Sequence, residues 1–173
     1  LMQSPEASLL VCNPAQQGAA YWPVGRTNRI FLGHEWELPL RENSINRVLM
    51  VHGMEHSEQI SAMLDDLWRV LTPGGKLLIV VPNRRGLWAS SPRSPFGHGH
   101  PFSMAQMREA LTQHQFTFSR TSSALFIPPT RWRFLWHFAP QIEKIGKLFW
   151  PFFGGVLLIE AEKQIYAAIS EPV

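Results

Sequence analysis

The strongest constraint on the fold of this chain is a pair of apolar segments separated by a helix-like repeat. Val48 to Val51 is apolar at consecutive positions, as expected of a strand buried on both faces in a parallel sheet. Apolar residues then recur at three- and four-residue steps from Ile60 to Leu71, which predicts a helix with one apolar face. Leu77 to Val81 is a second continuously apolar segment. Together these segments predict a βαβ unit with parallel strands and a right-handed crossover.

Turn and capping residues set the ends of the predicted elements. Ser57 is suited to cap the start of the helix, and Thr72-Pro73-Gly74-Gly75 is suited to end it. Ser103 and Gln106 form a capping-box pattern before a second helix. The inner face of that helix is expected to carry Met104, Met107 and Leu111. The remaining elements are expected to be strands at Ser8–Cys12, Arg29–Leu32, within Gln115–Ile127 and at Val156–Ile159, and a helix at Arg131–Pro151 interrupted at Pro140. Strands alternating with helices indicate an open α/β sheet.

The composition indicates a single globular domain that spans residues 1–173. Hydrophobic residues make up 45% and charged residues 17% of the 173 residues, which is enough apolar material to bury a core. The net charge of +3 is small and the basic residues are scattered, which favours a solvated surface over a nucleic-acid partner. Cys12 is the only cysteine, so no intrachain disulfide can form, and a cytoplasmic location is expected. The sequence has no run of the ~18 uninterrupted apolar residues that a membrane span needs.

Three stretches of sequence carry a resemblance to a known family. Leu38 to Leu49 has the form LPLxxxSIxRVL, Met54 to His56 is MEH, and Leu67 to Asn83 is LWRVLTPGGKLLIVVPN. Over about Gly33 to Asn83, the sequence resembles class I S-adenosylmethionine-dependent methyltransferases of the small-molecule, methyltransferase type 11-like kind. The resemblance implies a Rossmann-like sheet, mostly parallel with an antiparallel last strand, and helices on both faces. It also implies S-adenosylmethionine as cofactor and methyl transfer to a small-molecule acceptor that the sequence does not identify.

Ligands of open α/β sheets bind beyond the carboxyl ends of the strands, and the resemblance implies which residues of this chain lie there. The implied cofactor-binding residues are Asn13, His34, Glu35, Trp36, His52 and Gly53. Asn13 stands where the family has a carboxylate for the ribose hydroxyls, so this contact is weakened. Residues 34–36 stand at the family's adenine contact, and residues 52–53 are expected to face the methionine portion of the cofactor.

The family's first strand and its glycine-rich loop have no counterpart in this sequence. Only Gly18 and Gly25 precede Gly33, and neither lies in a G-x-G-x-G pattern. The first strand occupies the middle of the family's sheet, so Ser8–Cys12 is expected to have no direct neighbour in Val48–Val51. Because the chain also does not begin with Met, we expect a fragment whose upstream part completes the cofactor site. The alternative to a fragment is a domain that has dispensed with the first strand. The alternative to the enzyme function is a methyltransferase-like binding or assembly module that does not catalyse.

Histidines and arginines offer further chemistry. His52 to His56 has the H-x-x-E-H form of a zinc-peptidase helix, but a strand end followed by Gly53 lacks that helix, so packing of Met54 and His56 in a turn is the preferred interpretation. Gly97-His98-Gly99-His100 has no Cys, Asp or Glu nearby to complete a metal site, and no metal is expected. A basic rim after Leu77–Val81 is instead predicted to contact an anionic substrate, with a solvated loop as the equal alternative. The rim consists of Arg84, Arg85, Arg93, His98 and His100. The general-base candidates, by location alone, are His56, His98 and His100.

Residues 130–154 form an aromatic and basic segment that resembles helical insertions between late strands of the family. Such insertions shape the acceptor site, so one interpretation is a lid over the substrate pocket. A second is a helix at a membrane interface. A third is ordinary core packing or a homodimer contact. The sequence leaves all three open.

Overall fold

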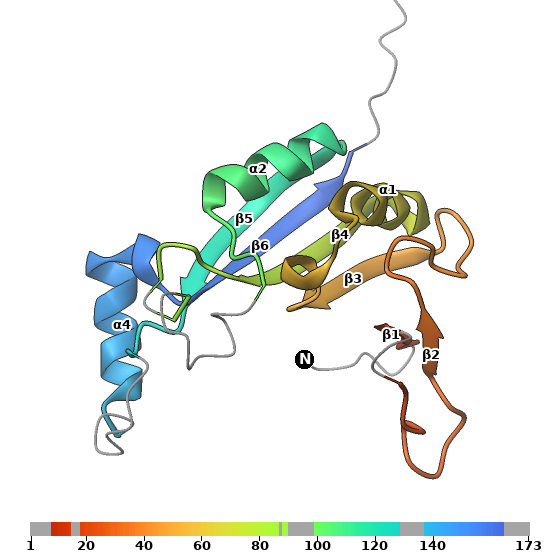
Figure 1. Cartoon of the computed structure of the whole chain (residues 1–173), viewed down its shortest axis with the longest axis horizontal. Coiled ribbons are helices and arrows are strands. Elements are labelled where there is room, and N and C mark those ends of the chain that lie inside the picture. The colour runs from red at the N-terminus through yellow and green to blue at the C-terminus, as the bar shows by residue number, and fades with distance from the viewer. Residues whose placement is uncertain (1–7, 15–17, 87, 90–98, 129–136, 165–173) are drawn as a thin grey trace, which may run out of the picture.

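The computed structural model describes residues 8–14, 18–86, 88–89, 99–128 and 137–164, which form two β-sheets (Figure 1). The smaller sheet pairs β1 (Val11–Pro14) with β2 (Ile30–Gly33) in parallel. The larger sheet has four strands in the order β3-β4-β6-β5. The α/β class expected from the alternating elements is confirmed.

The larger sheet contains β3 (Ile45–Val51), β4 (Leu71–Pro82), β5 (Phe116–Ala124) and β6 (Val156–Lys163). β3 and β4 are parallel, as predicted for the βαβ unit, with Val48 opposite Leu77. β6 runs antiparallel to both of its neighbours, β4 and β5. Three strands therefore point one way and the last strand opposes them, which confirms the predicted mostly parallel sheet with an antiparallel last strand.

Helices α1 (Ile60–Val70) and α2 (Met104–Gln113) lie over the same face of the larger sheet (Figure 1). Their inner faces pack on the strands in one apolar cluster, which includes Met63, Leu64, Leu67, Leu77, Ile79, Met107, Leu111 and Ile159. Each fully buried aliphatic side chain of this kind contributes about 1.5–3 kcal/mol. The cluster therefore fixes the sheet on which the loops at the strand ends are mounted.

One face of β3 is open to solvent. Leu49 and Val51 are 49% and 54% exposed, whereas Val48 and Met50 pack against the core cluster. The prediction that residues 48–51 are buried on both faces is therefore wrong. The physical reason is that β3 lies at an edge of the sheet and that α1 and α2 cover only its other face (Figure 1). The remaining helix, α4 (Ala139–Phe149), projects from the far end of the molecule and does not cover β3.

Two predicted element ends differ from the structure, and one agrees. The N-cap of α1 is Gln59 rather than Ser57, because the Ser57 hydroxyl instead accepts a hydrogen bond from the Gln59 N–H (3.2 Å) ahead of the helix. β4 begins at Leu71, directly after α1, so Thr72–Gly75 ends the helix as predicted but already belongs to the strand. The predicted capping box at the start of α2 is confirmed.

The smaller sheet stands apart from the edge of β3 (Figure 1). β1 starts at Val11 rather than Ser8 and is only partly buried, so the predicted buried strand at Ser8–Cys12 is wrong in its bounds and its burial. Within the described residues, β1 pairs with β2 and β3 pairs with β4. The expectation that Ser8–Cys12 has no direct neighbour in Val48–Val51 is therefore confirmed.

Candidate functional site

The turn that follows β3 has an unusual backbone. His52 has a φ of +54°, in the left-handed region, which costs an L-residue about 1–2 kcal/mol. Gly53 then caps the short 3-10 helix η2 (Met54–His56). Met54 is fully buried, as predicted for this turn, whereas His56 is exposed. The buried Met54 anchors the turn, so the surrounding structure can hold His52 in its strained conformation.

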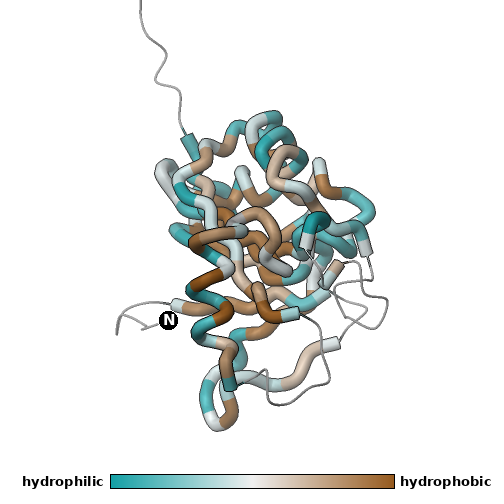
Figure 2. Tube along the Cα trace, turned by 90° about the vertical axis from the view of Figure 1, so that its left-hand side faces the viewer, coloured by the Kyte–Doolittle hydropathy of each residue, from teal (hydrophilic) through white to brown (hydrophobic). Residues whose placement is uncertain are grey.

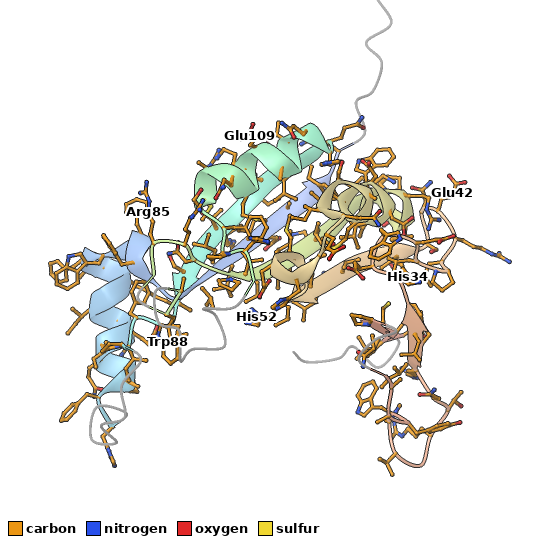
Figure 3. All side chains as sticks on the ribbon, in the orientation of Figure 1. His34, Glu42, His52, Arg85, Trp88 and Glu109 are labelled. Atoms are coloured by element: carbon orange, nitrogen blue, oxygen red, sulfur yellow. The ribbon has the colours of Figure 1, made fainter. Side chains whose placement is uncertain are left out.

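His52 and Glu55 are joined through their side chains within this turn. His52 Nδ1 lies 2.7 Å from Glu55 Oε1 across the turn at Gly53, which separates the end of β3 from η2. Glu55 is 2% exposed, and within the described part of the chain its second oxygen, Oε2, has no hydrogen-bond partner. The His52 side chain is 34% exposed and lies at the end of β3 (Figure 3). A buried carboxylate thus orients a histidine that lies partly at the surface.

A second segment, from the loop before α2, closes on the same turn. The His100 N–H donates a hydrogen bond to the Glu55 carbonyl oxygen (3.0 Å). Gly99 has a φ of +87°, and a Cβ there would lie 2.7 Å from that oxygen and 3.1 Å from the His56 ring, so glycine is required at this position. The structure therefore gathers three of the candidate histidines, His52, His56 and His100, around Glu55.

The zinc interpretation of this cluster gains no support. Among the residues that the structure describes, no group of three or more His, Cys, Asp or Glu side chains is arranged to hold a metal ion. His52 precedes η2 instead of lying on a helix with His56, as the sequence pattern indicated.

The predicted substrate rim is only partly described. Arg84 and Arg85 follow β4 and are exposed, and Figure 3 shows Arg85 on the side of the molecule away from His52. Between them and the strand, buried Asn83 fixes the end of β4 by donating to two backbone carbonyls near the start of β6 (2.7 and 2.8 Å). The rim residues Arg93 and His98 lie outside the described residues. The rim stays a prediction.

The turn after β2 contains the predicted adenine contact. The rings of His34 and Trp36 stack with their centroids 4.9 Å apart and an angle of 21° between their planes. Trp36 also packs against the core cluster, which ties this turn to the larger sheet. In Figure 3, His34 and His52 lie at well-separated positions, so the two predicted cofactor turns do not meet.

β1 meets the turn after β2 at two points. Cys12 lies close enough to Gly33 that a Cβ added there would be 3.6 Å from its sulfur. Burial raises the pKa of the Cys12 thiol, and the charge of Glu35 raises it further. Asn13 Nδ2 donates to the Gly18 carbonyl oxygen (3.1 Å), so this amide group closes its own loop. The amide nitrogen of this predicted ribose contact is therefore already used in a hydrogen bond to the loop after β1.

A cavity lies at the opposite end of β3 and β4. It has a volume of about 500 Å³ and is lined by Glu42, Asn43, Trp68, Arg69, Pro73, Gln115, Lys163 and Gln164. Buried Lys163 donates to Asn43 Oδ1 (2.7 Å) and to the Leu71 carbonyl (2.8 Å), and its Nζ lies 3.9 Å from the centroid of the Trp68 ring. Burial lowers the pKa of Lys163, and Glu42 opposes that shift.

Sequence reasoning missed this lysine, because a single Lys near a strand end is usually a surface residue. The Lys163 contacts lie at the amino ends of the parallel strands, whereas ligands of open α/β sheets bind at the carboxyl ends. We therefore assign Lys163 to the structure of the sheet. Neither this cavity nor a smaller one, of about 230 Å³, is lined by a predicted cofactor residue.

The aromatic segment 130–154 is described from residue 137 onward. Pro140 lies in the first turn of α4, where a residue without an N–H is tolerated. The predicted interruption at Pro140 stays a prediction, because residues 131–136 lie outside the described residues. Glu143 attaches α4 to the body by accepting hydrogen bonds from the N–H groups of residues 125 and 126. Figure 2 shows apolar residues winding along the outward side of this helix. Within the described part of this segment, the large apolar side chains that are at least half exposed are Phe138, Ile145, Leu148, Phe149, Trp150, Phe152 and Phe153.

This exposure makes the ordinary-core interpretation wrong for those residues. The lid, homodimer and membrane-interface interpretations stay predictions. Of the helices in the described ranges, none is long and apolar enough to cross a membrane. The basic and aromatic residues Arg131, Trp132, Arg133, Leu135 and Trp136 lie outside the described residues.

Comparisons with known proteins agree with the fold. Residues 15–79 match the model of the family described as methyltransferase domain, and no curated protein matches the chain. An S-adenosylmethionine-dependent methyltransferase from Thermotoga maritima superposes with a TM-score of 0.55 at 16% identity, over 78% of this chain and 64% of that protein. The methyltransferase solved with its activator Trm112 from Haloferax volcanii gives 0.54 at 16% identity, over 79% and 61%. One from Mesorhizobium loti gives 0.53 at 14% identity, over 80% and 71%.

The predicted resemblance to class I methyltransferases and the Rossmann-like fold are thus confirmed. The chain spans less than two thirds of the length of the first two of these proteins. The cofactor that the family implies is S-adenosylmethionine. The chemistry of the described residues suits it in part, with a stacked ring pair at 34–36, an amide at Asn13 and the turn at His52–Gly53. The described cavities do not join these three features.

Proposed function

We propose that this chain, which has the fold of class I S-adenosylmethionine-dependent methyltransferases, contributes to methyl transfer from that cofactor to a small-molecule acceptor. The observation that carries the proposal is the match of residues 15–79 to the methyltransferase domain, because this range contains both turns predicted to contact the cofactor. When bound, the cofactor supplies a methyl group on a positively charged sulfur. The protein's part is then mainly to position the two reactants.

Each predicted contact has a proposed role. The stacked His34–Trp36 pair offers an aromatic surface to the adenine, with Glu35 beside it. Asn13 keeps its side-chain oxygen as an acceptor toward the ribose, since the hydrogen bond that it makes to residue 18 uses the amide nitrogen. The backbone at His52–Gly53 approaches the methionine portion. Substrate contact is assigned to Arg84, Arg85, His98 and His100.

Calorimetric titration with S-adenosylmethionine and S-adenosylhomocysteine tests this function. We expect binding in the micromolar range for the protein, and at least about tenfold weaker binding for Trp36→Ala, since an aromatic contact to a base contributes about 1–3 kcal/mol. Trp150→Ala is the matched control, because Trp150 is exposed near α4, and it should bind like the wild type. Circular dichroism checks that Trp36→Ala stays folded. No binding of either ligand at high micromolar concentration would refute the enzyme proposal.

A non-catalytic binding or assembly module is the second candidate. It is favoured by the separation of the His34 and His52 turns (Figure 3) and by the hydrogen bond from the Asn13 side chain to the Gly18 carbonyl in the loop after β1. The same titration separates the two candidates, because a module without a cofactor site binds neither ligand.

The location and partners of the protein are also proposals. A cytoplasmic location follows from the single cysteine, and nucleic acid is not part of the proposal because the net charge of +3 is small. The exposed aromatic side chains of residues 138–153 support a homodimer contact first and a membrane-surface contact second. Size-exclusion chromatography with light scattering tests the homodimer, and flotation with liposomes tests the membrane contact.

A further inference from the structure

We propose that His52 is the general base that takes a proton from the methyl acceptor, and that Glu55 is its positioning residue. The inference rests on the proposed function and adds a substrate class to it. The acceptor is one whose attacking atom carries a proton, a hydroxyl or an ammonium group. Acceptors that are already ionised at neutral pH, such as carboxylates, do not need this base.

The geometry of the pair assigns the roles of the two ring nitrogens. His52 Nδ1 lies 2.7 Å from Glu55 Oε1, and an ionised carboxylate can only accept a hydrogen bond. Nδ1 therefore holds the ring proton, and the lone pair of the neutral imidazole is on Nε2. The partner of one ring nitrogen thus decides which atom of His52 serves as the base.

The burial of Glu55 argues for more than packing. Glu55 is 2% exposed, and within the described residues its Oε2 has no hydrogen-bond partner. A carboxylate in this position is costly to bury, and a structural role alone would be served by an apolar side chain. The negative charge of Glu55 is functional when His52 accepts a proton, because it stabilises the imidazolium that forms.

The backbone conformation of His52 adds a second energetic cost within the same pair of residues. Its φ of +54° places a non-glycine residue in the left-handed region, which persists only where the surrounding structure enforces it. Buried Met54 and the His100 N–H bonded to the Glu55 carbonyl (3.0 Å) enforce it here. The strained backbone of His52 and the buried carboxylate of Glu55 therefore belong to one hydrogen-bonded pair. His52 lies at the carboxyl end of β3 (Figure 3), where ligands of such sheets bind.

The proposed step balances without a further reactant. An acceptor hydroxyl gives its proton to His52 Nε2 as it attacks, whereas an ammonium gives up its proton first, because its nitrogen has no lone pair until then. The oxygen or nitrogen lone pair then forms a bond to the methyl carbon of the sulfonium donor. The bond between that carbon and sulfur breaks, and its electron pair stays on sulfur as a neutral thioether. The proton of the acceptor moves to His52 Nε2 and later returns to solvent. Among the other base candidates, exposed His56 has no bonded carboxylate in the described part of the chain, His100 contributes a backbone group, and His98 lies outside the described residues.

The first experiment needs neither cofactor nor substrate. Nitrogen-15 NMR of the histidine rings reports which nitrogen of the neutral His52 ring carries the proton. We expect the Nδ1-protonated form for His52, with the exposed His137 as the reference ring. A wild-type protein with the His52 proton on Nε2 would overturn the assignment of Nε2 as the base.

The second experiment measures methyl transfer to tyramine, which carries a hydroxyl and an ammonium, and to phenylacetate, whose carboxylate is already ionised. His52→Ala should slow methylation of tyramine by at least about 100-fold, exogenous imidazole should restore part of the rate, and carboxylate methylation should change far less. Glu55→Gln should also slow tyramine methylation, whereas the control His137→Asn should not. Binding of S-adenosylhomocysteine should be equal in all variants.

The outcomes separate this inference from the function on which it rests. Loss of S-adenosylhomocysteine binding by the wild type refutes the proposed function. Intact binding with no turnover of tyramine, equal rates for wild type and His52→Ala, or no rescue by imidazole refutes the base role of His52.

Discussion

Replacing Arg69 by alanine tests what holds the loop between β2 and β3 in place. Arg69 is in the last turn of α1, and its side chain reaches back to the Leu38-Pro39-Leu40 segment. Its Nη1 and Nη2 donate to the carbonyls of Leu40 (2.8 Å) and Leu38 (2.9 Å), and its Nε donates to Asp66 Oδ1 (2.7 Å). Asp66 Oδ2 in turn accepts from the Leu38 N–H (2.7 Å).

The magnitude follows from the three bonds that Arg69→Ala removes. At about 1 kcal/mol net for each hydrogen bond, the loss would be about 3 kcal/mol. The Arg69 side chain is 37% exposed, so water replaces part of the lost bonding and screens the ion pair with Asp66. We therefore expect unfolding to become easier by about 2 kcal/mol. Arg69→Lys should lose most of this as well, because an ammonium cannot reproduce the planar fork that reaches both carbonyls.

Urea unfolding followed by tryptophan fluorescence measures this change. Arg41→Ala is the matched control, since it removes the same charge from the exposed part of the same loop, and it should change stability by less than about 0.5 kcal/mol. Hydrogen exchange of the Leu38 amide should accelerate in Arg69→Ala and not in the control. Equal stabilities of the two variants, with an unchanged Leu38 exchange rate, would refute the view that this network fastens the loop.

Three further predictions concern other parts of the chain. Gly146→Ala should destabilise the protein by about 1–3 kcal/mol in urea, because a Cβ there would clash with the Phe126 ring. The hydrogen bond and charge of Lys76 lower the pKa of Glu160, so Glu160 stabilises the fold above its ordinary pKa and loses this effect as pH falls through the lowered value; the stability advantage of wild type over Glu160→Gln should shrink in acid. Burial raises the pKa of the Cys12 thiol, so iodoacetamide should alkylate it more slowly at pH 8 than free cysteine.

Each of these predictions has a result that would contradict it. A Gly146→Ala variant as stable as Lys147→Ala, on the exposed side of α4, would show that this helix moves freely to admit a methyl group. If the difference in stability between wild type and Glu160→Gln does not change with pH, the ion pair of Glu160 with Lys76 does not contribute to the pH dependence of stability. Alkylation of Cys12 at the rate of free cysteine would mean that the thiol is not buried in solution.

The sequence predicted the βαβ unit well, because its signals are local. The apolar steps from Ile60 to Leu71 and the continuous apolar segment Leu77–Val81 appear as α1 and the centre of β4. The sequence did not reveal the structural role of the Leu38-Pro39-Leu40 segment. Its partners, Asp66 and Arg69, sit among the polar residues of α1, where periodicity marks only a solvated side.

The failure at Val48–Val51 has a different cause. A continuous apolar segment records that both faces of a strand suit an apolar environment, but it does not say which layers cover them. Here α1 and α2 pack over the face that carries Val48 and Met50, and Leu49 and Val51 remain exposed. Whether a strand is central or at an edge depends on its neighbours in the sheet, which local pattern cannot predict.

The candidate site was visible in the sequence only as an unresolved pattern. The spacing of His52 to His56 suggests zinc chemistry, but that chemistry needs a helix that this turn does not form. The turn at Gly53 instead brings the side chains of His52 and Glu55 to within 2.7 Å of each other. A histidine at a strand end and an acid three positions later is therefore a signal that could have found this pair.

The separation of the two sheets connects the cofactor question to the fold. A site at the carboxyl edge of an open α/β sheet needs turns from several neighbouring strands, yet the turns at His34 and His52 belong to different sheets. β1 and β3 do not pair within the described residues. A ligand that bridges both turns binds more tightly to an arrangement in which the sheets are joined, so cofactor binding and sheet joining must favour each other. Tight binding of S-adenosylhomocysteine should therefore be accompanied by slower hydrogen exchange along the edges of β1 and β3. Tight binding without that protection would mean that one turn alone holds the cofactor.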